Sequence, residues 1–280
     1  MTSSGGRPNA GLLYERDLFN DLQSKGFIPA GSRVAGADDS IPDITIQNSA
    51  GTQAGVEIKL QVGAAFGSQV LHFDYGQVAR QGDESTPWYI PTVAPGTTNA
   101  LMRDFAEQVN LIDTVNATWW TNNIVNRQHY VPYGASDERG GRALYESTAP
   151  PRPTRNAGAQ YESDRNNLSG GSGFWVDIPA STIRDYYTSK DSYYMQIGQG
   201  QGLYWMGVSD PLNIQRQIPL FNPGRSRFRV RVQPKGGTTY SIQFAIYIQQ
   251  LGRSDLTLGN NVGTGTNYTG ITPSPNLSFL

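Results

Sequence analysis

The chain contains no cysteine, only two histidines and no long apolar run. Without cysteine, disulfide bonds, zinc–thiolate sites and thiol nucleophiles are excluded, and the redox compartment stays open. His72 and His129 are far apart in the sequence, which argues against a multi-histidine zinc site. The N-terminus has no apolar segment, and no run approaches the ~18 residues of a membrane-spanning helix. We therefore expect a non-secreted, cytoplasmic protein with no membrane partner.

Glycine (32) and proline (17) are abundant, together with asparagine, threonine and tyrosine, which favours a strand- and loop-rich chain with few long helices. The net charge is −1 and by itself implies no partner. Acidic side chains predominate in the first half and basic side chains in the second. This asymmetry is typical of an enzyme that acts on a polyanion, and a chance fluctuation is the alternative.

Residues 41–60 carry the most informative pattern, two short strands joined by a tight Asn-Ser-Ala-Gly connection. Side chains alternate along a strand, so Glu57 and Lys59 share one face, while Val56 and Ile58 share the other. Asp43 stands at the start of the first strand. Two carboxylates and a lysine on one side of an apolar hairpin are costly to desolvate without a partner. The pattern therefore indicates a metal site.

A helix is predicted over residues 9–25, with Gly26 as its C-terminal cap. Leu12, Glu15, Phe19 and Leu22 follow a helical spacing, which places Glu15 on the inward face. Beside Asp43 and Glu57, it is a third candidate carboxylate. The alternative is a residue at the edge of the apolar stripe, paired with an arginine.

After Lys59, the pattern predicts a short helix over residues 64–69 that runs into a strand over residues 69–75. Gln69 is a candidate to orient a water or a phosphate near the site, or else an ordinary polar residue at a helix end. His72 is interpreted as a structural or surface residue.

The composition and residue patterns divide the chain into five segments. We predict a disordered lead-in at 1–8, a core at 9–130, a loop-rich connection at 131–172, a strand-rich basic portion at 173–252 and a loosely ordered tail at 253–280. Within the basic portion we expect a strand at 174–178, a helix at 181–189 and a hairpin of strands 193–198 and 202–207.

Four arginines alternate with apolar residues on a predicted strand over residues 225–233, which a Gly-Gly turn joins to a strand at 239–248. Stacked like charges repel one another, so a counter-anion is expected. One interpretation is a β-ribbon on a nucleic-acid backbone, and the other is pairing with acidic neighbours on the sheet. The candidate nucleic-acid contacts are Arg225, Arg227, Arg229, Arg231 and Lys235.

The sequence Pro42-Asp43, separated by thirteen residues from Glu57-Ile58-Lys59, resembles the signature of the PD-(D/E)XK nuclease superfamily, and Glu15 resembles the acidic residue that many members carry on a preceding helix. The resemblance covers about the first 75 residues. It implies that Asp43, Glu57 and the carbonyl of Ile58 bind Mg²⁺ or Mn²⁺, that Lys59 handles the attacking water or the phosphate charge, and that Glu15 recruits metal.

The resemblance further implies an α/β restriction-endonuclease-like core, a mixed sheet flanked by helices, with a strand-rich C-terminal portion. The expected activity is metal-dependent hydrolysis of DNA, by an endonuclease in preference to an exonuclease. The expected setting is the cytoplasm of a bacterium or of a phage-infected host. Cutting both strands of a duplex calls for two active sites and so implies a homodimer. The competing hypothesis is a non-enzymatic, β-rich virion or assembly protein.

Overall fold

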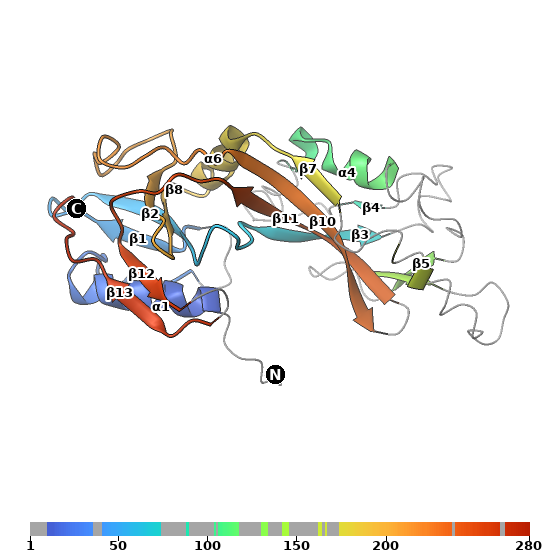
Figure 1. Ribbon diagram of the computed structural model, residues 1–280, viewed down its shortest axis with the longest axis horizontal. Helices are drawn as coiled ribbons and strands as arrows, with labels where there is room; N and C mark the ends of the chain where they lie inside the picture. Colours follow the sequence, from blue (N-terminus) through green and yellow to red (C-terminus); the bar gives the residue numbers. More distant parts are fainter. Residues whose placement is uncertain are drawn as a thin grey trace. The chain divides into compact units, whose positions relative to one another are not determined.

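The computed structural model describes residues 10–35, 41–73, 88–89, 104, 106–117, 130–133, 142–145, 162–163, 166, 174–236, 239–263 and 267–280. Contacts divide the chain into two compact units (Figure 1). The first unit combines Met1–Phe66, Pro179–Ser226 and Tyr247–Leu280, and the second combines Gly67–Ile178 and Arg227–Ile246. The chain therefore leaves the first unit twice and returns to it twice. This division differs from the sequence-based boundaries at residues 130, 172 and 252.

The first unit contains a mixed four-stranded sheet in the order β1-β2-β8-β9. Strands β1 and β2 are antiparallel, β2 and β8 are parallel, and β8 and β9 are antiparallel. The mixed sheet confirms the α/β expectation. Its strands are β1 (Ile44–Gln47), β2 (Gln53–Lys59), β8 (Ser192–Ile197) and β9 (Gly202–Trp205).

The β1–β2 connection is the predicted tight turn. The side-chain oxygen of Asn48 accepts hydrogen bonds from the backbone N–H groups of Ala50 (3.1 Å) and Thr52 (2.9 Å). Gly51 adopts a positive φ of 79°, which glycine reaches without steric cost. The local sequence thus sets the register of the hairpin, with Ile44 opposite Val56.

Helix α1 (Ala10–Ser24) packs on one face of this sheet and is followed by Gly26 at a φ of 82°, as expected of a C-terminal cap. Its buried face is formed by Tyr14, Glu15, Leu18, Phe19 and Leu22. The predicted stripe was partly wrong, because Leu12 is 48% exposed. The inward position of Glu15, which is 6% exposed, is confirmed.

Helix α6 (Ala180–Thr188) lies on the other face of the sheet (Figure 1). The apolar cluster that contains the α1 side chains includes Ile44, Ile46, Val56 and Ile58. Because side chains alternate along a strand, Glu57 and Lys59 project to the opposite face, the one on the α6 side. Charged and apolar residues of β2 are thereby separated into two layers.

The C-terminal segment completes the core of the first unit, so the expectation of a loosely ordered tail was wrong. Strands β12 (Gly259–Val262) and β13 (Gly270–Pro273) form an antiparallel pair. Leu258, Leu277 and Leu280 are buried in the same apolar cluster as α1. The Tyr14 hydroxyl also donates a hydrogen bond to the carbonyl of Gly259 (2.7 Å). Apolar burial decides the order of this segment despite its glycine-rich composition.

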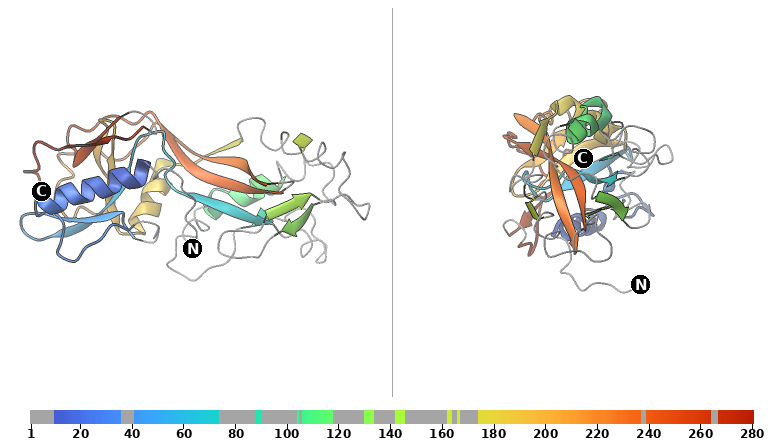
Figure 2. Two further views of the ribbon diagram at one scale, coloured as in Figure 1. Left: turned by 90° about the horizontal axis from the view of Figure 1, so that it is seen from below. Right: turned by 90° about the vertical axis from the view of Figure 1, so that its right-hand side faces the viewer.

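The second unit contains a seven-stranded sheet with the core order β4-β3-β11-β10-β7, in which β6 pairs with β11 and β5 pairs with β6. The predicted strand near 174–178 and the long hairpin are confirmed, and Figure 2 shows β10 and β11 as a long orange pair. The strands are β3 (Ser68–Phe73), β4 (Trp88–Tyr89), β5 (Tyr130–Tyr133), β6 (Arg142–Tyr145), β7 (Phe174–Asp177), β10 (Arg225–Gly236) and β11 (Thr239–Gln249), and a short helix, α4, spans Leu111–Thr114.

Strand β6 and all but the first residue of β5 fall inside the predicted loop-rich connection at 131–172, while most of that connection lies outside the described residues. In the part of the chain that the structure describes, no helix combines the length and apolar character needed to cross a membrane.

Candidate functional site

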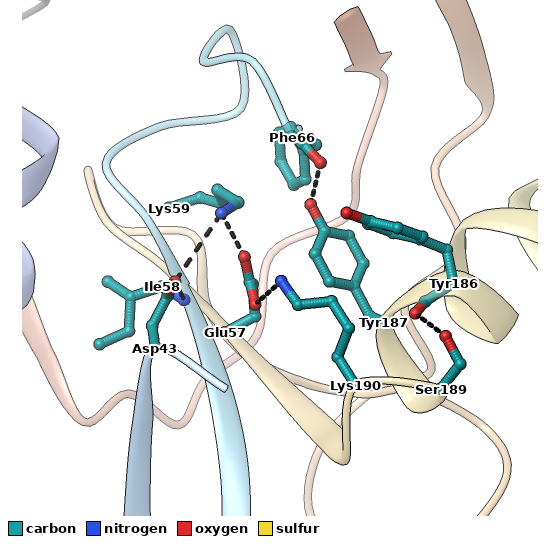
Figure 3. Close-up of polar contacts among 9 residues, drawn as sticks. All are labelled: Asp43, Glu57, Ile58, Lys59, Phe66, Tyr186, Tyr187, Ser189 and Lys190. Atoms are coloured by element: carbon teal, nitrogen blue, oxygen red, sulfur yellow. Dashed lines mark hydrogen bonds and ion pairs between the residues drawn. The ribbon is translucent and has the colours of Figure 1, made fainter. Parts of the chain in front are cut away.

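The β1–β2 hairpin brings Asp43 and Glu57 together. Ile44 lies opposite Val56, so the register continued by one residue places Asp43 opposite Glu57. The backbone N–H of Ile58 donates a hydrogen bond to Asp43 Oδ2 (2.7 Å), which holds the carboxylate over β2 (Figure 3). The Asp43 side chain is 17% exposed and the Glu57 side chain 3%. Both carboxylates therefore belong to one largely buried site.

Lys59 joins the two carboxylates. Its Nζ lies 2.5 Å from Glu57 Oε1 and 3.8 Å from Asp43 Oδ2. The Lys59 side chain is 15% exposed, so part of it reaches the surface. The predicted convergence of Asp43, Glu57 and Lys59 thus exists in the fold, and it follows from the alternation of side chains on β2.

Lys190 is a second lysine in the site, and the sequence analysis missed it. Its Nζ lies 3.4 Å from Glu57 Oε2, and its side chain is 4% exposed. Lys190 follows α6 and precedes β8, whose parallel pairing with β2 brings it close to Glu57. Lysine is rare in this chain, at four residues, which is the one signal that could have drawn attention to it. Nothing local in the sequence reveals a pairing across 133 residues.

Two tyrosines of α6 close the site over the lysines. The Tyr187 ring centroid lies 5.7 Å from Lys59 Nζ and 5.4 Å from Lys190 Nζ, and the Tyr186 centroid lies 5.6 Å from Lys190 Nζ. These distances allow cation–π attraction. The Tyr187 hydroxyl donates a hydrogen bond to the carbonyl of Phe66, which anchors the ring (Figure 3). We call Asp43, Glu57, Lys59 and Lys190 the charged cluster.

Burial and neighbouring charge set the ionisation of the cluster. Burial, followed by the repulsion of Glu57, raises the pKa of Asp43 to about 6, although Lys59 and the Ile58 N–H oppose the rise. Burial also disfavours charge on Glu57, but Lys59 and Lys190 outweigh it and lower the pKa of this carboxyl below its ordinary value. Burial acts to lower the pKa of Lys59, yet Glu57 and Asp43 raise it above its usual range. Glu57 and Lys59 are therefore charged at neutral pH.

The donor set suits a hard divalent cation. Carboxylate and carbonyl oxygens are the ligands of Mg²⁺ and Mn²⁺, and Mg²⁺ commonly uses one or two carboxylates together with water and substrate phosphates. Within the described ranges, no group of three or more histidine, cysteine, aspartate and glutamate residues could hold a metal ion together. Asp43 and Glu57 would therefore need a backbone oxygen, water or phosphate to complete the coordination.

Glu15 and Gln69 were the other expected members of the site. Glu15 is buried on α1, whose apolar partners lie on the face of β2 opposite to Glu57 and Lys59, and it does not join Asp43 and Glu57 in a cluster of metal ligands. The predicted helix at 64–69 was wrong, because β3 begins at Ser68 and residues 61–67 form turns and bends, but the strand expected at 69–75 is confirmed by β3 (Ser68–Phe73). Gln69 lies on β3 in the second unit, where its backbone is paired with Phe244. Strand pairing across the chain overrode the local helical pattern.

The arginine strand β10 has the predicted alternation. Phe228 and Val230 are fully buried, whereas Arg227, Arg229 and Arg231 are half-buried on the other face. Arg225 is exposed and is counted with the first unit. The side chain of Lys235 lies outside the described residues.

Neighbouring strands support this arginine face. The guanidinium carbon of Arg227 lies 3.8 Å, and that of Arg229 5.6 Å, from the ring centroid of Trp175 on β7. Arg231 donates hydrogen bonds of 2.9 and 2.7 Å to the side-chain oxygen of Gln243 on β11. Stacking on Trp175 and hydrogen bonds to Gln243 hold these guanidinium groups, and Arg227 also lies opposite the acidic Asp177 on β7. We call Arg227, Arg229, Arg231 and Trp175 the arginine face.

Chemically, the charged cluster combines oxygen ligands for a cation with an ammonium group that can contact a developing negative charge. Neither histidine nor cysteine is required for such chemistry. In comparisons with known proteins, no family model, no curated protein and no solved structure matches this chain.

Proposed function

We propose that the chain is a metal-dependent nuclease of the PD-(D/E)XK type that hydrolyses phosphodiester bonds in DNA. The observation that carries the proposal is the convergence of Asp43, Glu57 and Lys59, in which Lys59 Nζ lies 2.5 Å and 3.8 Å from the two carboxylates. Burying charged groups is costly, so a cluster of this kind in a hairpin suggests a chemical role. The spacing of the three residues is the one expected of that family.

Each residue has a role in the proposal. Asp43 and Glu57, with the backbone carbonyl of Ile58, would hold Mg²⁺ or Mn²⁺, which when bound supplies an activated water and neutralises phosphate charge. Lys59 donates a hydrogen bond to the attacking water or to the phosphate oxygen that gains negative charge. Hydrolysis adds water across one P–O bond and leaves a phosphomonoester and a hydroxyl group at the new ends.

The architecture of the first unit supports the proposal. A helix, α1, precedes the hairpin that carries Asp43 and the Glu-Ile-Lys sequence, and a second helix, α6, covers the other face of the mixed sheet. This is the arrangement expected of a restriction-endonuclease-like core. The departure is that the second helix comes after residues 67–178, most of which belong to the second unit. Glu15 has no role in the proposal, since it is not part of the charged cluster, and the side chain of Gln69 lies outside the described residues.

The arginine face supports a polyanionic substrate. Three half-buried guanidinium groups on one strand supply charge, and the exposed ring of Trp175 adds a surface for stacking. The choice of DNA over RNA depends on the family resemblance, so both nucleic acids belong in the assay.

The non-enzymatic assembly protein is the alternative. Glu15 and Lys59 were expected to distinguish the two hypotheses, because an assembly protein has no reason to direct both residues at Asp43. Lys59 lies close to Asp43, whereas Glu15 is buried on the other side of the sheet. The lysine thus favours the nuclease, and the glutamate does not contribute.

The test is incubation of the purified chain with plasmid DNA or RNA, in the presence of Mg²⁺ or Mn²⁺ and then of EDTA. We expect cutting that is abolished by EDTA and by Asp43→Asn. Asp185→Asn, which changes an exposed carboxylate on α6, is the matched control and should cut normally. Cutting that survives both chelation and Glu57→Ala would contradict the mechanism, and no cutting of either nucleic acid would favour the assembly protein.

A further inference from the structure

Both carboxylate oxygens of Glu57 are in contact with an ammonium group. Lys59 Nζ lies 2.5 Å from Oε1, and Lys190 Nζ lies 3.4 Å from Oε2 (Figure 3). A divalent cation that binds Glu57 must therefore approach an oxygen that already has a positively charged partner.

Lys190 is held in this position by its surroundings. The backbone N–H of Lys190 donates to the carbonyl of Tyr187 (3.0 Å), and the N–H of Asp191 donates to Thr188 (2.9 Å), in the turn that ends α6. The rings of Tyr186 and Tyr187 lie 5.6 and 5.4 Å from its Nζ. Because a buried ammonium group without a carboxylate is strongly disfavoured, this environment commits Lys190 to Glu57.

The two lysines differ in what they can do. Lys59 contacts both carboxylates and is partly exposed, so it can also reach a substrate. Lys190 is 4% exposed and contacts Glu57 from the side of the tyrosines. A group this deeply buried acts through Glu57 and not on the substrate, which makes Lys190 a positioning residue.

The charged cluster contains two carboxylates and two ammonium groups, so their formal charges cancel when all four are ionised. A divalent cation adds two positive charges to this balanced set. Bringing it in requires an ammonium group to move away or a further anion to arrive. The phosphodiester of the proposed substrate is such an anion.

We propose that Lys190 holds Glu57 in the metal-free protein and competes with the divalent cation for it, so that the site binds the cation weakly until a phosphodiester contributes its negative charge. This inference rests on the proposed metal-dependent function. It goes further by assigning to a residue outside the family motif the control of when the metal binds.

The test measures Mn²⁺ binding to the full chain in the absence of nucleic acid. The binding is monitored by calorimetry or by the electron paramagnetic resonance signal of free Mn²⁺. Lys190→Met removes the charge and keeps the length of the side chain, and Lys190→Gln removes the charge but keeps an N–H donor. We expect both variants to bind Mn²⁺ about tenfold more tightly than the wild type, because the competitor for Glu57 is gone. Circular dichroism identifies which variants are folded, and Lys190→Gln is the second route should Lys190→Met fail to fold.

Lys25→Met is the matched control. Lys25, just after the end of α1, pairs with Asp21 at 2.7 Å, so this variant also removes one lysine from an ion pair, and it should leave Mn²⁺ affinity unchanged. If neither folded Lys190 variant binds Mn²⁺ more tightly than the wild type, the inference is overturned and the metal site remains. Absence of Mn²⁺ binding by every variant at millimolar metal, both without and with added DNA, would instead remove the metal site itself, and the proposed function with it.

Discussion

Replacing Glu57 by glutamine should destabilise the first unit strongly, although the change is nearly isosteric. Glutamine removes the carboxylate that faces Lys59 and Lys190 at 2.5 and 3.4 Å. Lys59 keeps Asp43 at 3.8 Å, but the 4% exposed Lys190 loses its carboxylate partner. The main cost therefore comes from one buried ammonium group.

The expected loss is about 3–5 kcal/mol of unfolding free energy, the usual effect of breaking a buried ion pair by removing one partner. For a chain of this size, that corresponds to a Tm lower by roughly 10 °C. Urea unfolding of the metal-free protein measures the change. The half-buried Trp205 on β9 reports on the first unit, although the fluorescence of the other tryptophans must be separated from it.

The double variant Glu57→Gln/Lys190→Met separates this explanation from a loss of packing. Removing the stranded ammonium group should recover most of the lost stability, so the double variant should be more stable than Glu57→Gln alone. A loss below about 1 kcal/mol for Glu57→Gln would refute the reasoning. So would a double variant that is no more stable than the single one.

Three further outcomes are expected. Asp43→Asn should stabilise the metal-free protein at neutral pH, by up to roughly 3 kcal/mol, because the folded chain holds this carboxyl at a pKa of about 6 against an ordinary 3.8. With that sign, wild-type stability should rise as the pH falls through 6 towards 4, and the Asp43→Asn variant should lack this part of the pH profile in thermal unfolding. Alanine substitutions of Arg227, Arg229 and Arg231 should weaken DNA binding and reduce the slope of log affinity against log salt concentration by up to about 3. An unchanged slope would assign these residues to packing. Deleting residues 277–280 removes Leu277 and Leu280 from the apolar cluster that contains the buried face of α1, and should lower the Tm by several degrees. An unchanged Tm would show that this segment contributes nothing to the core.

Local patterns predicted much of the candidate site. The hairpin at residues 41–60 is specified by alternating strands and an Asn-Ser-Ala-Gly turn, so the meeting of Asp43 and Glu57 needs only contacts that are near in sequence. The same alternation predicted the separation of the arginines from Phe228 and Val230 on β10. The inward position of Glu15 followed from helical spacing, but spacing within one helix does not say which face of the sheet that helix covers.

Only the tertiary structure decided the rest. Lys190 reaches Glu57 because β8 pairs in parallel with β2 after the chain has passed through the second unit, and no local pattern encodes that pairing. The strand predicted at 69–75 forms as β3 and pairs with β11, whereas the short helix expected before it does not form. The C-terminal segment is ordered because α1 leaves an apolar surface that Leu258, Leu277 and Leu280 cover. The sequence by itself thus determined the Asp-Glu-Lys hairpin, through short-range periodicity, while long-range strand pairing and burial determined its counter-cation and surroundings.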